Sequence, residues 1–199
     1  MSTTFFWRIA LSVSCALTTT AIVAEPVTYQ VDPRHTYPAF EADHQGGLSV
    51  WRGKVERSSG TIVLDREAQT GTVNMTMDMD SINFGLEAMT AHAKRDDILD
   101  VEQFPTSTYT GTLTKFNRTG EPTAVEGHLT LHGVTQPVDL QINRFQCQPN
   151  GAGVDTCGAD VSASFNRDDF GVTFGQANGF LMFVNILIQI EAQRVEPNS

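Results

Sequence analysis

The sequence predicts an all-β fold with antiparallel strands, on the basis of alternating polarity and of turn signals between the alternating segments. Residues 72–79 read Thr-Val-Asn-Met-Thr-Met-Asp-Met, so odd positions are apolar and even positions polar. Because successive side chains of a strand point to opposite faces, this segment is a half-buried strand. Further strands are predicted at 108–116, 125–131, 138–143 and 161–165, with shorter ones at 28–31, 48–54 and 60–65.

The last predicted strand, 180–192, differs because its first part is apolar on both faces. Phe180 to Val184 form an uninterrupted apolar run, after which Ile186, Ile188 and Ile190 share one face. Strands that read as continuous apolar runs are buried on both sides. We expect the start of this strand to be covered outside as well as inside.

One segment between the strands has helical composition. Residues 86–99 carry Leu86, Met89 and Ala93 at helical spacing, followed by four charged residues. This spacing places the three apolar side chains on one face. The sequence predicts a helix over 86–99 with that face turned inward, and Pro105 marks the entry into the next strand.

Eight or more antiparallel strands form either a sandwich or a closed barrel. A barrel of about eight strands can hold one ligand, whereas a sandwich core is filled by side chains. The inward-facing Met75, Met77 and Met79 suit an adaptable cavity lining, although composition alone favours methionines that fill a solid core. Periodicity therefore leaves both architectures open.

The first 24 residues have the order of a secretory signal peptide. Arg8 precedes an apolar run over 9–17, and small residues lead to Ala24, after which we place the cleavage site. The alternative is a lipoprotein anchored through Cys15, although Ser12 stands where such sites carry Leu. Residues 25–199 form one domain without an internal repeat or linker, and no later stretch is long enough to cross a membrane.

The charge of the chain argues against one class of partner, and its cysteines predict a disulfide. Acidic residues outnumber basic ones 23 to 13, and the basic residues form no cluster, which argues against a nucleic-acid partner. Cys147 and Cys157 flank a turn-rich loop, which predicts a disulfide across a hairpin in an exported protein. Free thiols or a metal pair are the alternatives, and no nearby His or third Cys completes a tetrahedral site.

Several ordered motifs in the chain closely resemble the YceI-like family of bacterial exported proteins. The most specific motif is Gly-His-Leu-Thr-Leu-His-Gly-Val-Thr-Gln-Pro-Val at 127–138, supported by Asn-Arg-Asp-Asp-Phe-Gly at 166–171. The other motifs are Tyr29-x-Val31-Asp32-Pro33-x-His35, His44, Ser81-Ile82, the segment 94–99 and Phe104-Pro105. The cysteine loop does not belong to this pattern and marks a subgroup.

The resemblance implies an extended, lipocalin-like antiparallel β-barrel of about eight strands with a helix near one end. The interior of such a barrel binds a long-chain isoprenoid or another amphipathic lipid. The resemblance therefore favours a hollow barrel over a solid core. The resemblance implies no catalytic activity, no cofactor other than bound lipid, a periplasmic location and a homodimer.

We expect the lipid chain to lie against inward-facing apolar side chains, with histidines near a barrel mouth. His35 and His44 flank Phe40, where a short helix or turn could cap the mouth, but His35 could equally fix the Asp32-Pro33 turn by hydrogen bonding. The candidate ligand-binding residues are His35, Phe40, His44, Met75, Met77, Met79, Phe84, Met89, Leu129, Leu131, Phe165, Phe170 and Phe183.

The remaining polar motifs have simpler interpretations. His128 and His132 lie opposite Leu129 and Leu131, hence outside the barrel, and too far apart along a strand to share a metal ion. The charged run 167–169 favours an ion-paired turn over a catalytic cluster. We expect no metal site. The function predicted is a carrier or storage protein. The alternatives are an enzyme acting on a lipid or quinone, with His35, His44 or Arg167 in the mouth, and a structural stress-response barrel without a ligand.

Overall fold

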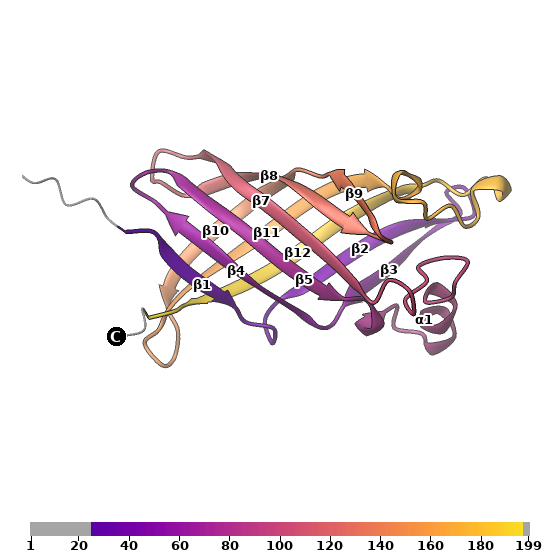
Figure 1. Ribbon diagram of the computed structural model, residues 1–199, viewed down its shortest axis with the longest axis horizontal. Helices are drawn as coiled ribbons and strands as arrows, with labels where there is room; N and C mark the ends of the chain where they lie inside the picture. The colour runs from indigo at the N-terminus through magenta and orange to yellow at the C-terminus, as the bar shows by residue number, and fades with distance from the viewer. Residues whose placement is uncertain (1–24, 197–199) are drawn as a thin grey trace, which may run out of the picture.

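The computed structural model describes residues 25–196, which form one antiparallel sheet curled into a long barrel (Figure 1). The predicted signal peptide and Cys15 lie outside the described residues. Among the described residues, no helix has the length and apolarity needed to span a membrane. The strands are β1 (Val27–Val31), β2 (Tyr37–His44), β3 (Ser49–Val55), β4 (Ser58–Asp65), β5 (Thr70–Asp78), β6 (Ile82–Asn83), β7 (Thr106–Phe116), β8 (Pro122–Leu131), β9 (Val134–Pro137), β10 (Leu140–Pro149), β11 (Asp155–Asn166) and β12 (Phe183–Arg194). The helices are α1 (Glu87–Ala93) and the 3-10 helices η1 (Met79–Ser81), η2 (Arg167–Phe170) and η3 (Gln176–Asn178).

The barrel closes through β12. Eight strands follow the order β1, β4, β5, β7, β8, β10, β11 and β12, and β12 then pairs back onto β1 with Val31 opposite Ala192. This confirms the predicted barrel of about eight strands. The same edge of β12 also pairs with β2, where Ile188 lies opposite Pro38, so β2 and β3 extend the wall towards the α1 end of the molecule.

The structure corrects the expectation of a short helix or turn around Phe40, because this residue lies in β2. The segment was hard to recognise because Pro38, Ala39 and Ala42 have low strand propensity and dilute its alternation. Pairing with β12 and β3 on both sides imposes the extended conformation.

The helix predicted over 86–99 is also shorter than expected. After Ala93 the chain tightens into turns, in which the amide of Arg95 donates to His92 O at 3.3 Å, and Asp100 has a positive φ of 42°. Met89 lines the interior and Ala93 is buried, as predicted, but Leu86 is 55% exposed. The helix therefore begins after Leu86 and covers only one end of the barrel.

The predicted faces of β5 are confirmed. Val73 is buried and Met75 and Met77 line the cavity, while Thr72, Asn74 and Thr76 are exposed on the outside. Met79, predicted to end this strand, instead begins η1 and is buried.

The strand predicted from residue 180 begins only at Phe183, and the expectation that residues 180–184 are covered on both sides is wrong, because Leu181 and Phe183 are 55% and 47% exposed. Only the inward face of β12 is buried.

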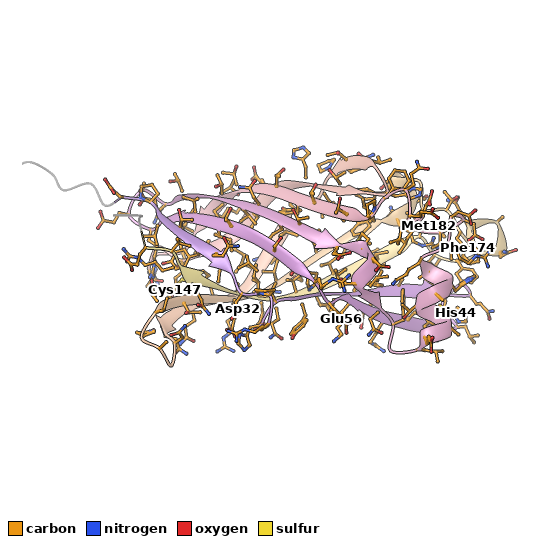
Figure 2. All side chains as sticks on the ribbon, turned by 60° about the horizontal axis from the view of Figure 1, so that its bottom comes forward. Asp32, His44, Glu56, Cys147, Phe174 and Met182 are labelled. Carbon is orange, nitrogen blue, oxygen red and sulfur yellow. A yellow bond between two sulfur atoms is a disulfide. The ribbon has the colours of Figure 1, made fainter. Side chains whose placement is uncertain are left out.

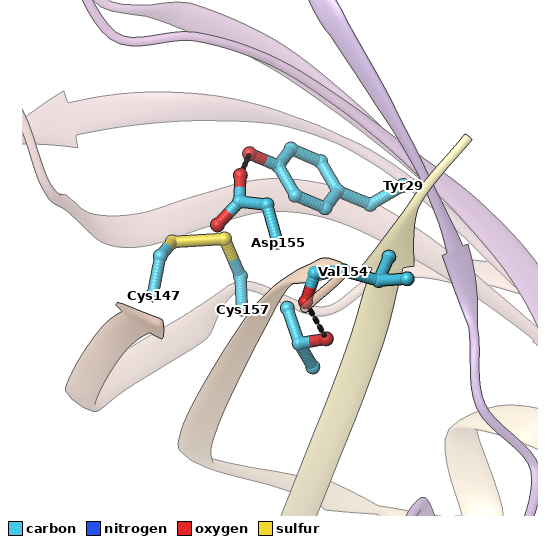
Figure 3. Close-up of a disulfide and its surroundings, with 6 residues drawn as sticks. Tyr29, Cys147, Val154, Asp155 and Cys157 are labelled. Atoms are coloured by element: carbon cyan, nitrogen blue, oxygen red, sulfur yellow. Dashed lines mark hydrogen bonds between the residues drawn. A yellow bond between two sulfur atoms is a disulfide. The ribbon is translucent and has the colours of Figure 1, made fainter. Parts of the chain in front are cut away.

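The predicted disulfide is present at the end of the barrel opposite α1 (Figures 2 and 3). Cys147 and Cys157 lie directly opposite each other in the β10–β11 pairing, with 4.0 Å between their Cα atoms. Beside them the Tyr29 hydroxyl of β1 donates to Asp155 Oδ2 at 2.9 Å. The hairpin tip is thereby fastened to the neighbouring wall.

Candidate functional site

The barrel encloses a cavity of about 520 Å³ that runs along its interior. Apolar side chains from β2, β3, β4, β5, β7, β8, β10, β11 and β12 line it, and α1 covers one end. Because the inward face of each strand is apolar, the alternation in the sequence becomes a continuous apolar wall.

The inward-facing side chains in the middle of the barrel retain accessible surface. Met75, Met77, Phe165, Ile186 and Ile188 point inward and line the cavity, yet they are only partly buried. In a close-packed core such side chains would lose almost all of their accessible surface to neighbours. The interior is therefore hollow, and the solid core favoured by composition alone is not what forms.

The disulfide end of the barrel is filled. Tyr29, Val31, Cys157 and Ala192 are buried there and pack together outside the cavity lining. Burial raises the pKa of the Tyr29 hydroxyl to about 12, and its hydrogen bond to Asp155 acts in the same direction. We call this packed end the floor of the cavity.

Aromatic rings surround the end of the barrel opposite the disulfide, where Figure 2 shows His44 beside α1. Consecutive rings are 5.1–6.5 Å apart, centroid to centroid, and meet edge to face. We call this set the aromatic collar; it consists of Phe40, Phe84, Trp51, His44, Phe180, Phe174 and His92. Most of its rings are partly exposed, so the cavity lining reaches the molecular surface at this end.

Glycine makes room for one ring of the collar and for a second ring deeper in the barrel. A Cβ atom on Gly53 would lie 2.5 Å from the Phe40 ring, and one on Gly127 would lie 2.3 Å from the Tyr109 hydroxyl. That hydroxyl donates to Val138 O at 2.9 Å, and burial raises its pKa. At these two positions the absence of a side chain on glycine lets an aromatic ring lie close to the backbone, so the two glycines determine where rings narrow the cavity.

Few polar groups reach the cavity, and the protein already satisfies most of them. The Ser107 hydroxyl donates to Thr130 O at 2.6 Å. The carboxylate of Asp43 accepts from the backbone amides of Gly46, Gly47 and Leu181, which lowers the pKa of Asp43 against a desolvation effect that raises it. These bonds join the β2–β3 turn to the segment before β12.

The sequence profile of the YceI-like domain matches residues 29–193. The chain belongs to the YceI-like family. It is 27% identical to protein YceI of Salmonella arizonae over 161 residues, covering 80% of this chain and 83% of that protein, and the YceI of Salmonella heidelberg matches equally.

Solved structures share the YceI-like fold. Burkholderia cenocepacia BcnA aligns with a TM-score of 0.62 at 22% identity, covering 81% of this chain and 99% of BcnA. A polyisoprenoid binding domain from Saccharophagus degradans, implicated in plant cell wall breakdown, aligns with a TM-score of 0.61 at 14% identity, covering 85% and 99% of the two chains. At these identities the likeness establishes the fold alone.

Most of the residues predicted for ligand contact line the cavity of this YceI-like barrel. They come from six separate parts of the chain and meet only because the sheet closes. The residues are Phe40, His44, Met75, Met77, Met79, Phe84, Met89, Leu129, Leu131 and Phe165.

Three predicted residues lie elsewhere. His35 is in the β1–β2 turn, where its Nδ1 lies 2.9 Å from Asp32 Oδ2, which is the structural role weighed against ligand contact. Phe170 is only 1% exposed and packs behind Phe165, with 5.0 Å between ring centroids. Phe183 projects outward, because its neighbour Val184 takes the inward position on β12.

The sequence analysis did not assign Trp51 or Phe174 to the collar. Trp51 and Val55 lie on the inward face of β3, and a period-two pattern extended to residue 55 would have placed Trp51 on that face. Phe174 lies in an irregular segment, where no periodicity assigns a face. Figure 2 places Phe174 and Met182 at the same end as His44.

The histidines do not form a metal centre. Within residues 25–196, no group of three or more His, Cys, Asp or Glu side chains is arranged to hold an ion. His128 is exposed on the outside of β8, as predicted, whereas His132 lies in the following turn with a φ of 51° and packs on Phe104. His35 precedes β2 and His44 is its last residue, so the two histidines lie at opposite ends of this strand and do not share a mouth.

Proposed function

We propose that this YceI-like protein sequesters a long-chain isoprenoid or another long amphipathic lipid inside the barrel, as a carrier or a store. The observation that carries the proposal is the continuous apolar cavity of about 520 Å³ within a closed barrel. A pocket of this size and lining suits an apolar ligand of that class. The polyisoprenoid-binding neighbour with the same fold supports the choice of chemistry.

Chain burial supplies most of the affinity in this proposal. Each CH₂ group moved from water to an apolar site contributes about 0.8 kcal/mol. The tail points to the floor, and the head group lies at the aromatic collar, because Asp43, His44, His92 and Arg167 are all at that end of the lining.

We place the protein in the periplasm, delivered by the signal peptide predicted for residues 1–24. The disulfide supports this location, since such bonds persist in oxidising compartments. The homodimer implied by family resemblance stays a prediction. Phe183 and Leu187, exposed on the outer face of β12, are among the exposed apolar side chains that such a contact could use; light scattering of the purified protein tests it.

Mass spectrometry of protein purified without detergent tests the proposal. We expect a co-purifying lipid that organic extraction releases and that added lipid replaces. Replacing Met75, which faces the cavity, by Trp fills the space that the chain needs and should abolish binding. Replacing Thr76 by Trp adds the same bulk on the outside of the same strand and should leave binding intact. Absence of any bound lipid, together with failure of the delipidated protein to take one up, would overturn the proposal.

A further inference from the structure

Arg167 is the one permanent cation on the cavity lining of residues 25–196. It begins η2 directly after β11, and its backbone amide donates to Met182 O at 2.8 Å. Its guanidinium folds back towards the interior, where Nη1 donates to Val172 O at 2.8 Å and Nη2 donates to Phe174 O at 2.6 Å. The side chain is thereby held at the collar end of the cavity.

The guanidinium has no ion-pair partner within the described chain. Asp43 and Asp168 attract it through space and raise the pKa of Arg167, but burial has the larger effect and lowers it. Neither carboxylate pairs with it: Asp43 is held by three backbone amides, and Asp168 Oδ2 accepts from Gln176 Nε2 at 3.0 Å. The sequence-based expectation of an ion-paired turn at 167–169 is therefore wrong.

The guanidinium also has hydrogen-bonding capacity left over. It carries five N–H groups, of which two are used on the carbonyls of Val172 and Phe174, which leaves three. A half-buried cation with free donors beside an apolar cavity is costly unless a partner arrives. A carboxylate or a phosphate presents two oxygens in the planar spacing that a guanidinium matches.

We propose that Arg167 binds the head group of the lipid, and that this head group is an anion, either a carboxylate or a phosphate monoester. The inference rests on the proposed function and adds the chemical class of the head. An anion on Arg167 also orients the chain, with the head at the collar and the tail running towards Ile190 and the floor. No other permanent cation lies on the described lining, and the one carboxylate there, that of Asp43, is held by three backbone amides.

Four probes with the same sixteen-carbon chain test the head group on the delipidated wild-type protein: palmitate, hexadecyl phosphate, hexadecanol and hexadecyltrimethylammonium. Displacement of Nile red, a neutral dye, reports each affinity. We expect one or both anions to bind roughly tenfold or more tightly than hexadecanol, because hydrogen bonds to charged groups are the strong ones. The order of palmitate and hexadecyl phosphate distinguishes the two anionic sources.

Two variants connect the preference to the side chain. Arg167→Met should remove the preference for anions while hexadecanol still binds, and Arg167→Lys should keep part of it. Arg144→Met, on the exposed outer face of β10, is the control and should behave as wild type. Circular dichroism and hexadecanol binding verify that each variant is folded.

The outcomes separate this inference from the proposed function. Equal binding of hexadecanol and the anions, or a preference for the ammonium probe, overturns the role of Arg167 and leaves lipid sequestration standing. An anion preference that survives in Arg167→Met assigns the anion to another group and also overturns it. Failure of the wild type to bind any of the four probes counts against lipid sequestration itself.

Discussion

At the residue scale, Asp32 organises the turn between β1 and β2. Its Oδ1 accepts from the Arg34 amide at 3.0 Å, and its Oδ2 lies 2.9 Å from His35 Nδ1 and accepts from Gln193 Nε2 at 3.2 Å. The bond from the Arg34 amide, followed by that from His35, lowers the pKa of Asp32 from 3.8 to about 2. The ionised carboxylate therefore belongs to the folded state.

This depressed pKa gives stability a defined pH dependence. A lowered folded-state pKa stabilises the fold above the unfolded value of 3.8, and the contribution is lost as the pH falls through about 2. Asp32→Asn should lower the free energy of unfolding at pH 7 by about 1 to 3 kcal/mol, with a smaller difference near pH 2. Urea unfolding at the two pH values measures this. Asp160→Asn, at an exposed position of β11, is the matched control.

A second residue-scale prediction concerns Gly127. Its missing side chain admits the Tyr109 hydroxyl, which a Cβ atom would meet at 2.3 Å. Gly127→Ala should displace Tyr109 from Val138 O and destabilise the fold by about 1 to 3 kcal/mol. Gly151→Ala is the control, because nothing lies within 4 Å of a Cβ at that position. Equal thermal stability of the two variants would contradict this account.

At the scale of elements, the disulfide constrains the β10–β11 hairpin in the unfolded chain more than it shapes the folded one. The two cysteines are ten positions apart, and closing so short a loop is worth about 2 to 3 kcal/mol. Replacing both cysteines by Ala should lower the free energy of unfolding by that amount, as measured by denaturant unfolding. Lipid binding at the far collar should be retained, and its loss would mean that the floor depends on the covalent bond.

The elements also mark how far sequence reasoning reached. Strands such as β5 were predictable because the alternation of apolar and polar side chains indicates both that a strand is present and which of its faces points inward. β2 and the end of α1 were not, because pairing with β12 and the tight turns after Ala93 override local propensity. The disulfide followed from the two cysteines and their loop, whereas barrel closure with a hollow interior needed the family resemblance.

The residues of the candidate site also fall into a predictable group on the strands and an unpredictable group in the turns. The methionines of β5 and the leucines of β8 were found by period two, since the barrel turns one whole face of each strand inward. Phe174 was not assigned to the cavity, and Arg167 was placed at the mouth only in the enzyme alternative, because both sit in or beside short 3-10 turns and reach the cavity through loop geometry that no periodic pattern encodes. His35 was expected near the same mouth as His44, but the extended strand β2 lies between the two residues and separates them along the barrel.

At the scale of the whole molecule, the cavity has a collar at one end and a floor at the other, which predicts selection by chain length. Affinity should rise roughly fourfold for each added CH₂, the equivalent of about 0.8 kcal/mol, until the tail meets the floor, and then stop rising. A homologous series of saturated fatty acids measures this limit. Ile190→Trp, which projects into the cavity, should move the limit to shorter chains, whereas Gln189→Trp on the exposed face should not. A limit that is the same in both variants would contradict the floor.

The packed floor also governs the kinetics of exchange. Because Tyr29, Val31, Cys157 and Ala192 fill that end, we expect a bound lipid to leave through the collar, tail last, before a second lipid enters. Release should then follow a first-order rate that does not change with the concentration of competitor and that falls as the bound chain becomes longer, because more apolar surface has to return to water.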